Sequence, residues 1–421
     1  MNGNKKTFRV VTLGCRTNQY ESQAYQNQLL ALGYSQAPEG EPADICIVNT
    51  CTVTESADSH SRHAIRQLAK ENPHSQLLVT GCFADRQPDF VASLAGVTAV
   101  IPNKDKENLL KRVFPDETLP EFTIDHFQAH TRAFVKIQDG CNSFCTYCII
   151  PYVRGRSKSR TASEVVAEVQ SLIKNGYREV VLTGINIGDF DGGNEPCRLS
   201  DLIRTVDQIP GLDRLRVSSI DPDEVDDDLM DAILNGKKTC HSMHVVLQSG
   251  SNVILKKMNR KYTRQIFMET VERLKKASPD FTFTTDVIVG FPGETDLDFQ
   301  ESIEVIKEVE FAKVHMFPYS DRPRTRSALM PNKIPPDIIR ERKNEILRVA
   351  EQSAYRLRER FIGRKMALLL ERAESSRPNE ICGHTANFLN VWIPKEHLEP
   401  NQIVEVTLVK NTPEGLIGQL T

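Results

Sequence analysis

The sequence has little of the features that would assign a protein class at once. Its 421 residues include one Trp, and 53 Lys and Arg nearly balance 56 Asp and Glu, for a net charge of -3. This balance excludes a uniformly basic nucleic-acid-binding protein, so any RNA-binding surface must be local. No segment approaches the roughly 18 apolar residues of a membrane span, and no apolar run of signal-peptide length follows the lysines of the start MNGNKKTFRV. We therefore expect a cytoplasmic protein that does not enter a membrane.

Against this background the ten cysteines are the most informative residues. In the reducing cytoplasm, cysteines bind metal or take part in catalysis more often than they form a disulfide framework. The hydrophobic fraction of 39% is enough for several cores, and a chain of this length exceeds what one core usually serves. We expect an α/β protein with three domains, which cover residues 1–120, 127–355 and 360–421.

The first domain repeats one pattern, in which a short apolar strand ends in a cysteine and a polar, helix-like segment follows. The strands are RVVTLGC, DICIVNTC and LLVTGC, and the helices are ESQAYQNQLLALGY and ADSHSRHAIRQLAKEN, with apolar residues at steps of three and four. Strands that alternate with helices pair in parallel, and right-handed crossovers place the strand ends at one edge of the sheet. We expect a small α/β sandwich that ends in the proline-containing linker PDETLPEFTIDHF.

A second alternation of strands and helices begins at Phe134. The expected strands are FVKIQDGC, EVVLTGINIG, RLRVSSI, SMHVVLQSG, FTFTTDVIVGF and AKVHMFPYS, and the expected helices lie near residues 162–175, 199–208, 226–235, 263–276 and 297–309. So many units predict a partial parallel (β/α)6 barrel, with functional residues at the carboxyl ends of its strands. The last part of the chain contains the short apolar segments MALLLER, NFLNVWIP, IVEVTLVKN and GLIGQLT, which predict a small antiparallel β-barrel.

The segment GCNSFCTYC is the sharpest local signal. It holds Cys141, Cys145 and Cys148 so close in sequence that their thiolates can converge on one iron–sulfur cube. A cube of four irons held by three cysteines leaves one iron open, which a chelating amino acid can bind. The alternatives are a zinc site or buried cysteines, but structural zinc sites use four ligands, and no fourth lies nearby.

Three further cysteines, Cys15, Cys51 and Cys82, each end a strand of the first domain. One such cysteine would most often be a small buried hydrophobe. Three at equivalent places predict a second three-cysteine cluster, again with an open iron. Cys46 lies inside its strand and is expected in the core. The cysteines without a matching partner are expected to be structural, namely Cys197, Cys240 and Cys382.

These motifs resemble one known group of enzymes. The CxxxCxxC spacing, with the aromatic Tyr147 before its last cysteine, resembles the radical S-adenosylmethionine superfamily. Over essentially the whole chain the sequence resembles the methylthiotransferase family of that superfamily, through TLGC, NTC, TGC, GCNSFCTYCIIPYVRG, LTGINIG, LQSGS, MNRKYT, DVIVGFPGET and FPYS. The resemblance implies two [4Fe–4S] clusters and S-adenosyl-L-methionine as cofactors. It also implies that the cluster on Cys141, Cys145 and Cys148 makes a 5′-deoxyadenosyl radical. The cluster of the first domain then carries the sulfur or methylthio group.

Strand-end position and the resemblance together point to residues around S-adenosylmethionine. Thr183, Gly184 and Asn186 close the second barrel strand, where superfamily members place backbone groups near the methionine amine. Arg154, just beyond the cluster loop, is a candidate contact for a carboxylate or phosphate, although a loop arginine is more often exposed. The remaining candidates end the next three strands, where a glycine permits close approach of a ligand: Ser218, Ser219, Gln248, Ser249 and Gly290.

In this family the terminal β-barrel is the TRAM domain, which binds the substrate macromolecule. The resemblance therefore implies tRNA as a partner, bound at its anticodon stem-loop, and an electron donor such as flavodoxin or ferredoxin; we expect a monomer. Residues 336–365 hold nine basic against five acidic residues just before this barrel. Such a run is most often a solvated helix face, and its position favours contacts with tRNA phosphates.

Branches of the family act on an isopentenylated or a threonylcarbamoylated adenosine of tRNA, or on an aspartate of a ribosomal protein. The segments NTCTVT, IQDGCNSFCTYCIIP, LTGIN and LQSGSNVILKKMNRKYT look most like the threonylcarbamoyladenosine branch, which predicts a 2-methylthio product next to the anticodon. CRTN stands where CKxN is more usual, and DRPRTRSA follows FPYS where GT and a small residue are common. Two other classes stay open, a non-catalytic iron–sulfur RNA-binding module and a radical enzyme that acts on a protein.

Overall fold

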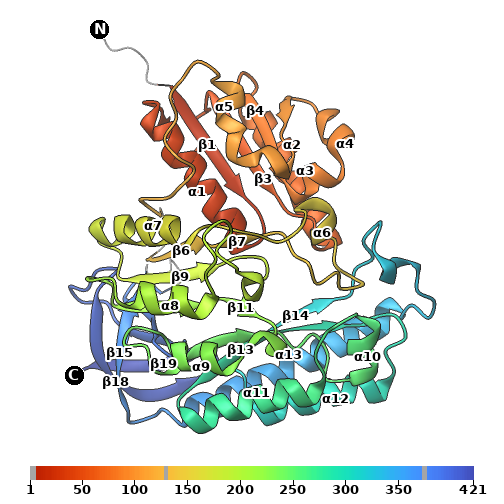
Figure 1. The fold of residues 1–421 in the computed structure, drawn as a ribbon, viewed down its shortest axis with the longest axis vertical. Helices are drawn as coiled ribbons and strands as arrows, with labels where there is room; N and C mark the ends of the chain where they lie inside the picture. The colour runs from red at the N-terminus through yellow and green to blue at the C-terminus, as the bar shows by residue number, and fades with distance from the viewer. Residues whose placement is uncertain (1–5, 128–130, 372–376) are drawn as a thin grey trace.

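A computed structural model describes residues 6–127, 131–371 and 377–421. Figure 1 shows the N-terminal sheet domain at the top, a larger α/β part beneath it and the C-terminal β-barrel at the side of that part. Helix α1 of the upper domain packs against strand β6 of the lower part. Tyr20 and Ala24 of this helix belong to the same apolar cluster as the strands and helices below, so the two parts share a core.

The N-terminal domain is a parallel sheet with strand order β2-β1-β3-β4-β5. Each predicted strand is present, and the short edge strands β2 and β5 add to them. The strands are β1 (Thr7–Thr12), β2 (Ser35–Gln36), β3 (Ile45–Thr50), β4 (Gln76–Gly81) and β5 (Val97–Val100), and the helices are α1 (Arg16–Ala31), α2 (Glu55–Glu71), α3 (Cys82–Arg86), α4 (Pro88–Ala92), the 3-10 turn Asn103–Asn108 and α5 (Leu109–Val113). Thr54 caps α2 by accepting from the Ala57 amide, which fixes where the chain turns after the sheet edge.

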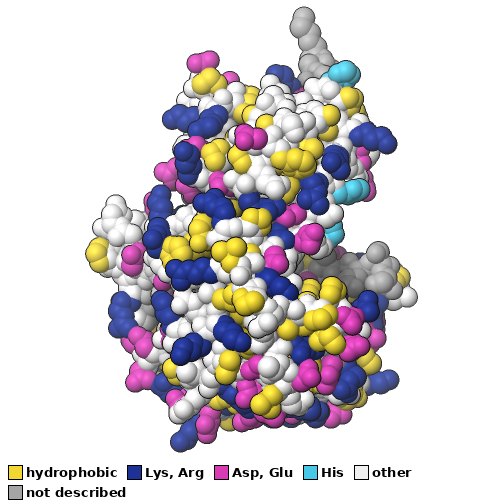
Figure 2. Space-filling model, turned by 90° about the vertical axis from the view of Figure 1, so that its right-hand side faces the viewer, with side chains coloured by type: hydrophobic (Ala, Val, Ile, Leu, Met, Phe, Trp, Pro, Cys, Tyr) yellow, Lys and Arg dark blue, Asp and Glu magenta, His cyan; other side chains and the backbone are white. Residues whose placement is uncertain are grey.

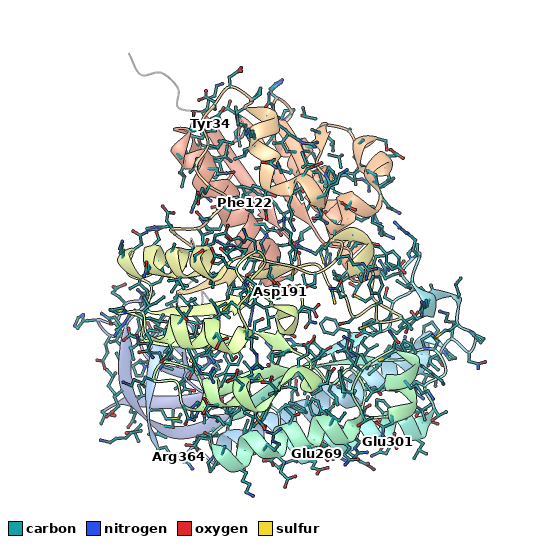
Figure 3. The ribbon with its side chains drawn as sticks, viewed as in Figure 1. Tyr34, Phe122, Asp191, Glu269, Glu301 and Arg364 are labelled. Atoms are coloured by element: carbon teal, nitrogen blue, oxygen red, sulfur yellow. The ribbon has the colours of Figure 1, made fainter. Side chains whose placement is uncertain are left out.

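The segment 115–127 has no helix or strand, as its prolines predict, but it is not a free linker. The ring of Phe122, labelled in Figure 3, lies 5.2 Å from Tyr25 and 6.4 Å from Tyr20. The Ile124 amide donates to the Glu168 carboxylate of α7. The connection therefore fastens the first domain to the barrel.

The central part is an open (β/α)6 barrel. Its strands form two parallel sheets, β10-β9-β6 and β11-β12-β13-β14, in which β11 continues β10 after Ser218. Among the described residues β14 does not pair with β6, so the barrel stays open there. The strands are β6 (Arg132–Lys136), β9 (Glu179–Thr183), β10 (Arg214–Val217), β11 (Ser219–Ile220), β12 (Ser242–Val245), β13 (Thr282–Val289) and β14 (Lys313–Pro318), with the small ribbon β7 (Gln138–Asp139) and β8 (Lys158–Ser159).

The helices of this part lie where the sequence pattern places them, between successive strands and, for α13, after the last strand. They are α7 (Ala162–Lys174), α8 (Leu199–Asp207), α9 (Asp227–Leu234), α11 (Arg264–Ala277), α12 (Asp296–Val309) and α13 (Pro336–Glu359), together with the short α6 (Ile150–Val153) and α10 (Asn252–Lys257) and the 3-10 turns Ile187–Asp189, Pro222–Glu224 and Arg326–Leu329. A capping box between Thr161 and Glu164 starts α7, and a second between Thr295 and Asp298 starts α12.

The C-terminal part is a closed barrel with strand order β15-β16-β17-β19-β18. Its pairings are antiparallel except that of β17 with β19, which is parallel. The predicted segment MALLLER ends at Arg372, which lies outside the described residues. The strands are β15 (Lys365–Leu370), β16 (Glu380–Thr385), β17 (Asn390–Pro394), β18 (Ile403–Thr412) and β19 (Gly415–Leu420).

This barrel caps the amino-terminal ends of the central strands. Arg214, the first residue of β10, donates to the carbonyls of His384 at 2.8 Å and Ala367 at 2.7 Å. Arg132 and Arg216 both lie over the ring of Phe388, at 5.5 and 5.1 Å. The opposite, carboxyl ends of the strands are thereby left for the functional site.

Candidate functional site

The cysteines of the N-terminal domain lie together at the carboxyl edge of its sheet. Cys15, Cys51 and Cys82 directly follow or adjoin β1, β3 and β4, which are neighbours in the sheet. A side chain on Gly14 would come within 2.8 Å of the Cys51 sulfur, so this left-handed glycine (φ 93°) lets the first strand end approach the second. The parallel pairing predicted from the sequence therefore brings these thiols to one place.

Arg154 reaches this edge from the barrel. Its side chain is fully buried, and its Nε donates to the Cys82 sulfur at 3.3 Å. The same guanidinium pairs with Glu21 of α1 at 3.0 Å and with Asp139 of the barrel at 2.7 Å. Two protein carboxylates therefore pair with Arg154, and its contact with a cofactor stays a prediction. The alternative of a solvent-exposed loop arginine is wrong, because the two domains close over the side chain.

The second set, Cys141, Cys145 and Cys148, lies on the loop after β7. Two hydrogen bonds fix this loop to α10 and its end, from the Thr146 amide to the Met258 carbonyl at 2.9 Å and from the Thr146 hydroxyl to the Lys257 carbonyl at 2.9 Å. Tyr147 is packed edge-on against Phe291, with ring centroids 6.5 Å apart. The cysteine loop is therefore fixed by α10, a segment that follows β12 and is distant in sequence.

Arg260 is a residue of this site that the sequence reasoning passed over. Its guanidinium donates to the Cys145 sulfur at 2.8 Å, pairs with Asp221 after β11, and lies 4.8 Å from the centroid of the Tyr262 ring. The segment MNRKYT contains it and is part of the family resemblance. The basic residue in that motif was the available signal, but its partner is 115 positions away in the chain.

The two cysteine sets meet across α6. Cys82 belongs to a small apolar cluster with Ile149 and Val153, and Ile149 directly follows Cys148. Asn103 of the N-terminal domain donates to the Val153 carbonyl at 2.7 Å, which adds a hydrogen bond between this domain and α6. The carboxyl edge of the first sheet thus stands over the carboxyl ends of the barrel strands.

Burial raises the pKa of five thiols in the two sets, those of Cys51, Cys82, Cys141, Cys145 and Cys148. It raises the pKa of Cys51 to about 12, and repulsion from Cys82 and Cys15 adds to this effect. Burial likewise raises the pKa of Cys145, against the opposing charge of Arg260. These five thiols are therefore protonated when no cation is bound, and a metal that binds them must displace their protons.

The described residues contain no group of three or more His, Cys, Asp or Glu side chains placed to hold a metal ion. Such a group surrounds one ion closely. A cube of four irons binds each cysteine through a different iron, so its ligands stand farther apart.

Several polar atoms at the carboxyl ends of the barrel strands are buried without a partner. They include the Thr183 hydroxyl and the side-chain carbonyl of Gln248, which lies beyond β12 in a left-handed conformation (φ 61°). Since buried polar atoms are nearly always paired, orphans here fit a polar ligand such as S-adenosylmethionine. Ser218 is buried and Ser219 half-buried beside them, and Ser249 is buried but accepts from the Ser251 amide.

The other predicted strand-end residues have partners within the protein. Gln138 accepts from the amides of Ile185 and Asn186, and a side chain on Gly184 would meet Gln138 at 2.9 Å. Asn186 also donates to Glu224 at 2.9 Å, and burial raises the pKa of Glu224 to about 7.

Gly290 is packed against a helix of the protein. A side chain there would meet Ile339 of α13 at 2.4 Å, and its amide donates to Glu294. Its small size is therefore required by this helix, and the contact with S-adenosylmethionine stays a prediction.

The remaining cysteines are placed as expected. Cys46, Cys240 and Cys382 are buried and Cys197 is half-buried. In the part of the chain that the structure describes, no helix is long and apolar enough to cross a membrane.

Comparisons with known proteins cover both halves of this site. A family model described as the radical SAM superfamily matches residues 135–306, and one described as uncharacterized protein family UPF0004 matches residues 7–102. The structure of the radical S-adenosylmethionine methyltransferase TsrM from Kitasatospora setae is similar with a TM-score of 0.56 at 14% identity, over 77% of this chain and 75% of that chain. This likeness concerns the fold.

Curated relatives match the chain over nearly its whole length. "Threonylcarbamoyladenosine tRNA methylthiotransferase MtaB" of Chlamydia pneumoniae is 48% identical over 99% of this chain and 98% of its own, and the protein of that name from Bacillus subtilis (strain 168) is 35% identical over 95% and 93%. "tRNA-2-methylthio-N(6)-dimethylallyladenosine synthase" of Clostridium botulinum is 33% identical over 98% and 96%.

The open parallel barrel with its CxxxCxxC loop defines a radical S-adenosylmethionine protein, a class that implies S-adenosylmethionine and a [4Fe–4S] cluster as cofactors. The full-length relatives narrow the class further. The chain belongs to the tRNA methylthiotransferase family.

Proposed function

We propose that this enzyme adds a methylthio group to C2 of N6-threonylcarbamoyladenosine next to the anticodon of tRNA. The observation that carries the proposal is the 48% identity, over nearly the whole of both chains, to a relative whose name states this substrate. The meeting of two three-cysteine sets at the domain junction supports it, because the reaction needs a radical and a sulfur donor at one place.

Each cysteine set has a proposed role. Cys141, Cys145 and Cys148 would hold the cluster that binds S-adenosylmethionine, and Cys15, Cys51 and Cys82 would hold a second [4Fe–4S] cluster. When bound, these groups supply a carbon radical at the barrel site and sulfur at the site of the N-terminal domain. Thr183 and Gln248, with their unpaired polar atoms, would orient S-adenosylmethionine, while Arg260 fixes the loop that carries Cys145.

Several further assignments belong to the same proposal. Reductive cleavage of S-adenosylmethionine requires an electron, which a small donor such as flavodoxin or ferredoxin would supply. The described helices include none that spans a membrane, and tRNA modification takes place in the cytoplasm, so we place the enzyme there. We also propose that the enzyme is a monomer.

The tRNA body would be held through its phosphates by exposed basic residues. On α13 these are Arg340, Arg348, Arg356 and Arg360, which are exposed. Arg342 is not available, because it is buried against Glu294 at 2.6 Å. Figure 2 shows further Lys and Arg side chains across the middle of one face, where the N-terminal domain meets the barrel.

Nucleoside analysis tests the function in cells. Cells that lack this chain should lose the 2-methylthio derivative of threonylcarbamoyladenosine and accumulate its precursor, and the wild-type gene should restore the product. A variant with Cys145→Ala should not restore it. Loss of the 2-methylthio derivative of dimethylallyladenosine instead would favour the second candidate substrate, which the Clostridium relatives act on by name.

A further inference from the structure

Arg16 is a residue of the N-terminal domain that reaches into the barrel. It directly follows Cys15 and begins α1, and its guanidinium carbon lies 5.3 Å from the centroid of the Phe134 ring on β6. Burial, together with the charges of Arg132 and Arg216, lowers the pKa of Arg16 to about 10. The side chain therefore remains a cation at neutral pH, in a largely enclosed place.

Two carboxylates act on the charge of Arg16, namely Glu179 and Asp286. Glu179 lies 2.9 Å from Arg216, and Asp286 lies 3.4 Å from the His244 ring. Both carboxylates thus contact other side chains.

Within residues 6–127, 131–371 and 377–421, the Arg16 guanidinium makes neither an ion pair nor a hydrogen bond; its one recorded contact is with the Phe134 ring. The side chain is half-buried, so an anion there would be partly shielded from water and would pair with it more strongly than with an exposed arginine. A guanidinium is also the group that best recognises a carboxylate, because its donors match the two oxygens. Arg16 is therefore placed to bind an anion from outside the chain.

The position of Arg16 limits what that anion belongs to. Its neighbour Cys15 is exposed, whereas Cys51 and Cys82 are buried. The accessible side of this cysteine set is therefore the side of Cys15, where Arg16 begins. A base that receives sulfur from this set must lie at that open side. Substituents of the base then fall within reach of Arg16.

We propose that Arg16 binds the carboxylate of the threonylcarbamoyl group and so selects this substrate over dimethylallyladenosine. The inference rests on the proposed function and adds the specificity residue to it. The threonylcarbamoyl group carries a carboxylate, whereas the dimethylallyl group is apolar and would cover Arg16 without pairing with it. A site built around a polar group rejects a substrate that lacks it much more strongly than an apolar pocket rejects a polar one.

A double-mutant cycle tests this with binding as the readout. One partner is the protein, as wild type, Arg16→Gln or Arg16→Lys, with S-adenosylmethionine present. The other is a tRNA anticodon stem-loop that carries either threonylcarbamoyladenosine or the analogue whose carboxylate is a neutral carboxamide. We expect wild type to bind the carboxylate about 30-fold more tightly or better, Arg16→Gln to bind both equally, and Arg16→Lys to fall between.

Two controls separate the possible results. Arg66→Gln, an exposed arginine on α2 of the same domain, should bind like wild type. Iron content and thermal unfolding show whether each variant is folded and loaded. If Arg16→Gln does not load, the comparison of the two stem-loops on wild type and Arg16→Lys still decides, and equal binding of both stem-loops by wild type would refute the role.

Turnover by wild type distinguishes this inference from the proposed function. If wild type methylthiolates threonylcarbamoylated tRNA but Arg16→Gln keeps the full preference for the carboxylate, Arg16 is not the specificity residue and the function stands. If wild type acts only on dimethylallylated tRNA, the proposed function itself is wrong and Arg16 loses its assigned ligand.

Discussion

Single residues connect the two cysteine sets more closely than the domain pattern suggests. Arg154 touches Cys82, Glu21 and Asp139 at once, so it joins the barrel to the sheet edge of the first domain. Lys106 adds to the same network through Glu21 at 2.7 Å. These charges are buried, where the loss of one partner is felt strongly.

Arg154→Met should lower the free energy of unfolding by about 3 kcal/mol, because Glu21 and Asp139 keep only their lysine partners. Urea denaturation of the metal-free protein measures this. Arg178→Gln is the matched control, since Arg178 pairs with Asp213 at 2.6 Å but both side chains are 39% exposed. Its effect should stay below about 1 kcal/mol, and equal losses in the two variants would contradict the buried network.

Glu224 should make stability depend on pH. Its pKa is raised from 4.5 to about 7, mainly by burial, so the folded protein holds the proton more tightly than the unfolded chain. The free energy of unfolding therefore falls as pH rises from 4.5 to about 7 and changes no further above it. With partial exposure allowed for, Glu224 should change the free energy of unfolding by about 2 kcal/mol over this pH range, and Glu224→Gln should remove that change.

Denaturation midpoints of the metal-free protein across this pH range measure the slope. Asp223→Asn changes the exposed neighbour in the same turn and should leave the slope as it is. A slope that persists in Glu224→Gln would assign the proton to another group.

At this scale the sequence predicts the cysteines but not their neighbours. Cys15, Cys51 and Cys82 follow apolar strands, so parallel pairing alone brings them to one edge. Arg154 and Arg260 acquire their partners only when distant segments meet, and no local period records that meeting. Gly290 was noticed at its strand end, but its contact with Ile339 of α13 was not predictable from the strand pattern.

Among the elements, the C-terminal barrel is fastened to the central strands by arginines of β10. Arg216 lies 2.9 Å from Glu179 and donates to the Ala386 carbonyl at 3.1 Å. Helix α13 adds a second attachment, since Arg358 donates to Asn411 at 3.0 Å and to the Thr412 carbonyl at 3.0 Å. Arg358 is thus a structural residue of the expected basic helix.

Arg216→Met should loosen this attachment and lower the free energy of unfolding by about 3 kcal/mol, because Glu179 is left buried with a weaker partner. Hydrogen exchange in β16 and β17 should rise with it. Adding Glu179→Gln to Arg216→Met should recover part of the loss, since the unpaired carboxylate is then gone. A double variant that is no more stable than the single one would show that Glu179 does not carry the cost.

The long, periodic elements were predictable, and the short ones were not. Every predicted barrel helix is present because each has an apolar face and most have a capping residue. Strand β2 has two residues and α10 has six, too few for a period to show. The parallel pairing of β17 with β19 depends on how the C-terminal barrel closes, which the strand pattern does not encode.

Across the whole molecule, ion pairs and a common apolar cluster join the first domain to the barrel. On the far side from Arg154, Arg322 of the segment after β14 pairs with Asp58 of α2 at 2.7 Å. This residue lies in DRPRTRSA, where the sequence departs from the family pattern, and it turns inward to the first domain. The sequence pattern predicts three domains. It does not predict the ion pairs that join the first domain to the barrel.

The arrangement predicts two cubes of four irons, one on each cysteine set. Anaerobically reconstituted protein should hold about eight irons, and the variant with Cys141, Cys145 and Cys148 replaced by alanine should hold about half. Iron and sulfide analysis measures both. One cube in the intact protein, with all six cysteines present, would refute the second cluster.

The central claim is that the domain junction methylthiolates threonylcarbamoyladenosine. The most direct measurement gives the reconstituted enzyme equal amounts of threonylcarbamoylated and dimethylallylated tRNA, with S-adenosylmethionine, a sulfide source and a reductant, and follows both products by mass spectrometry of nucleosides. The structure and the relatives predict 2-methylthio product from the threonylcarbamoylated tRNA and little from the other. Product from the dimethylallylated tRNA alone would contradict the account.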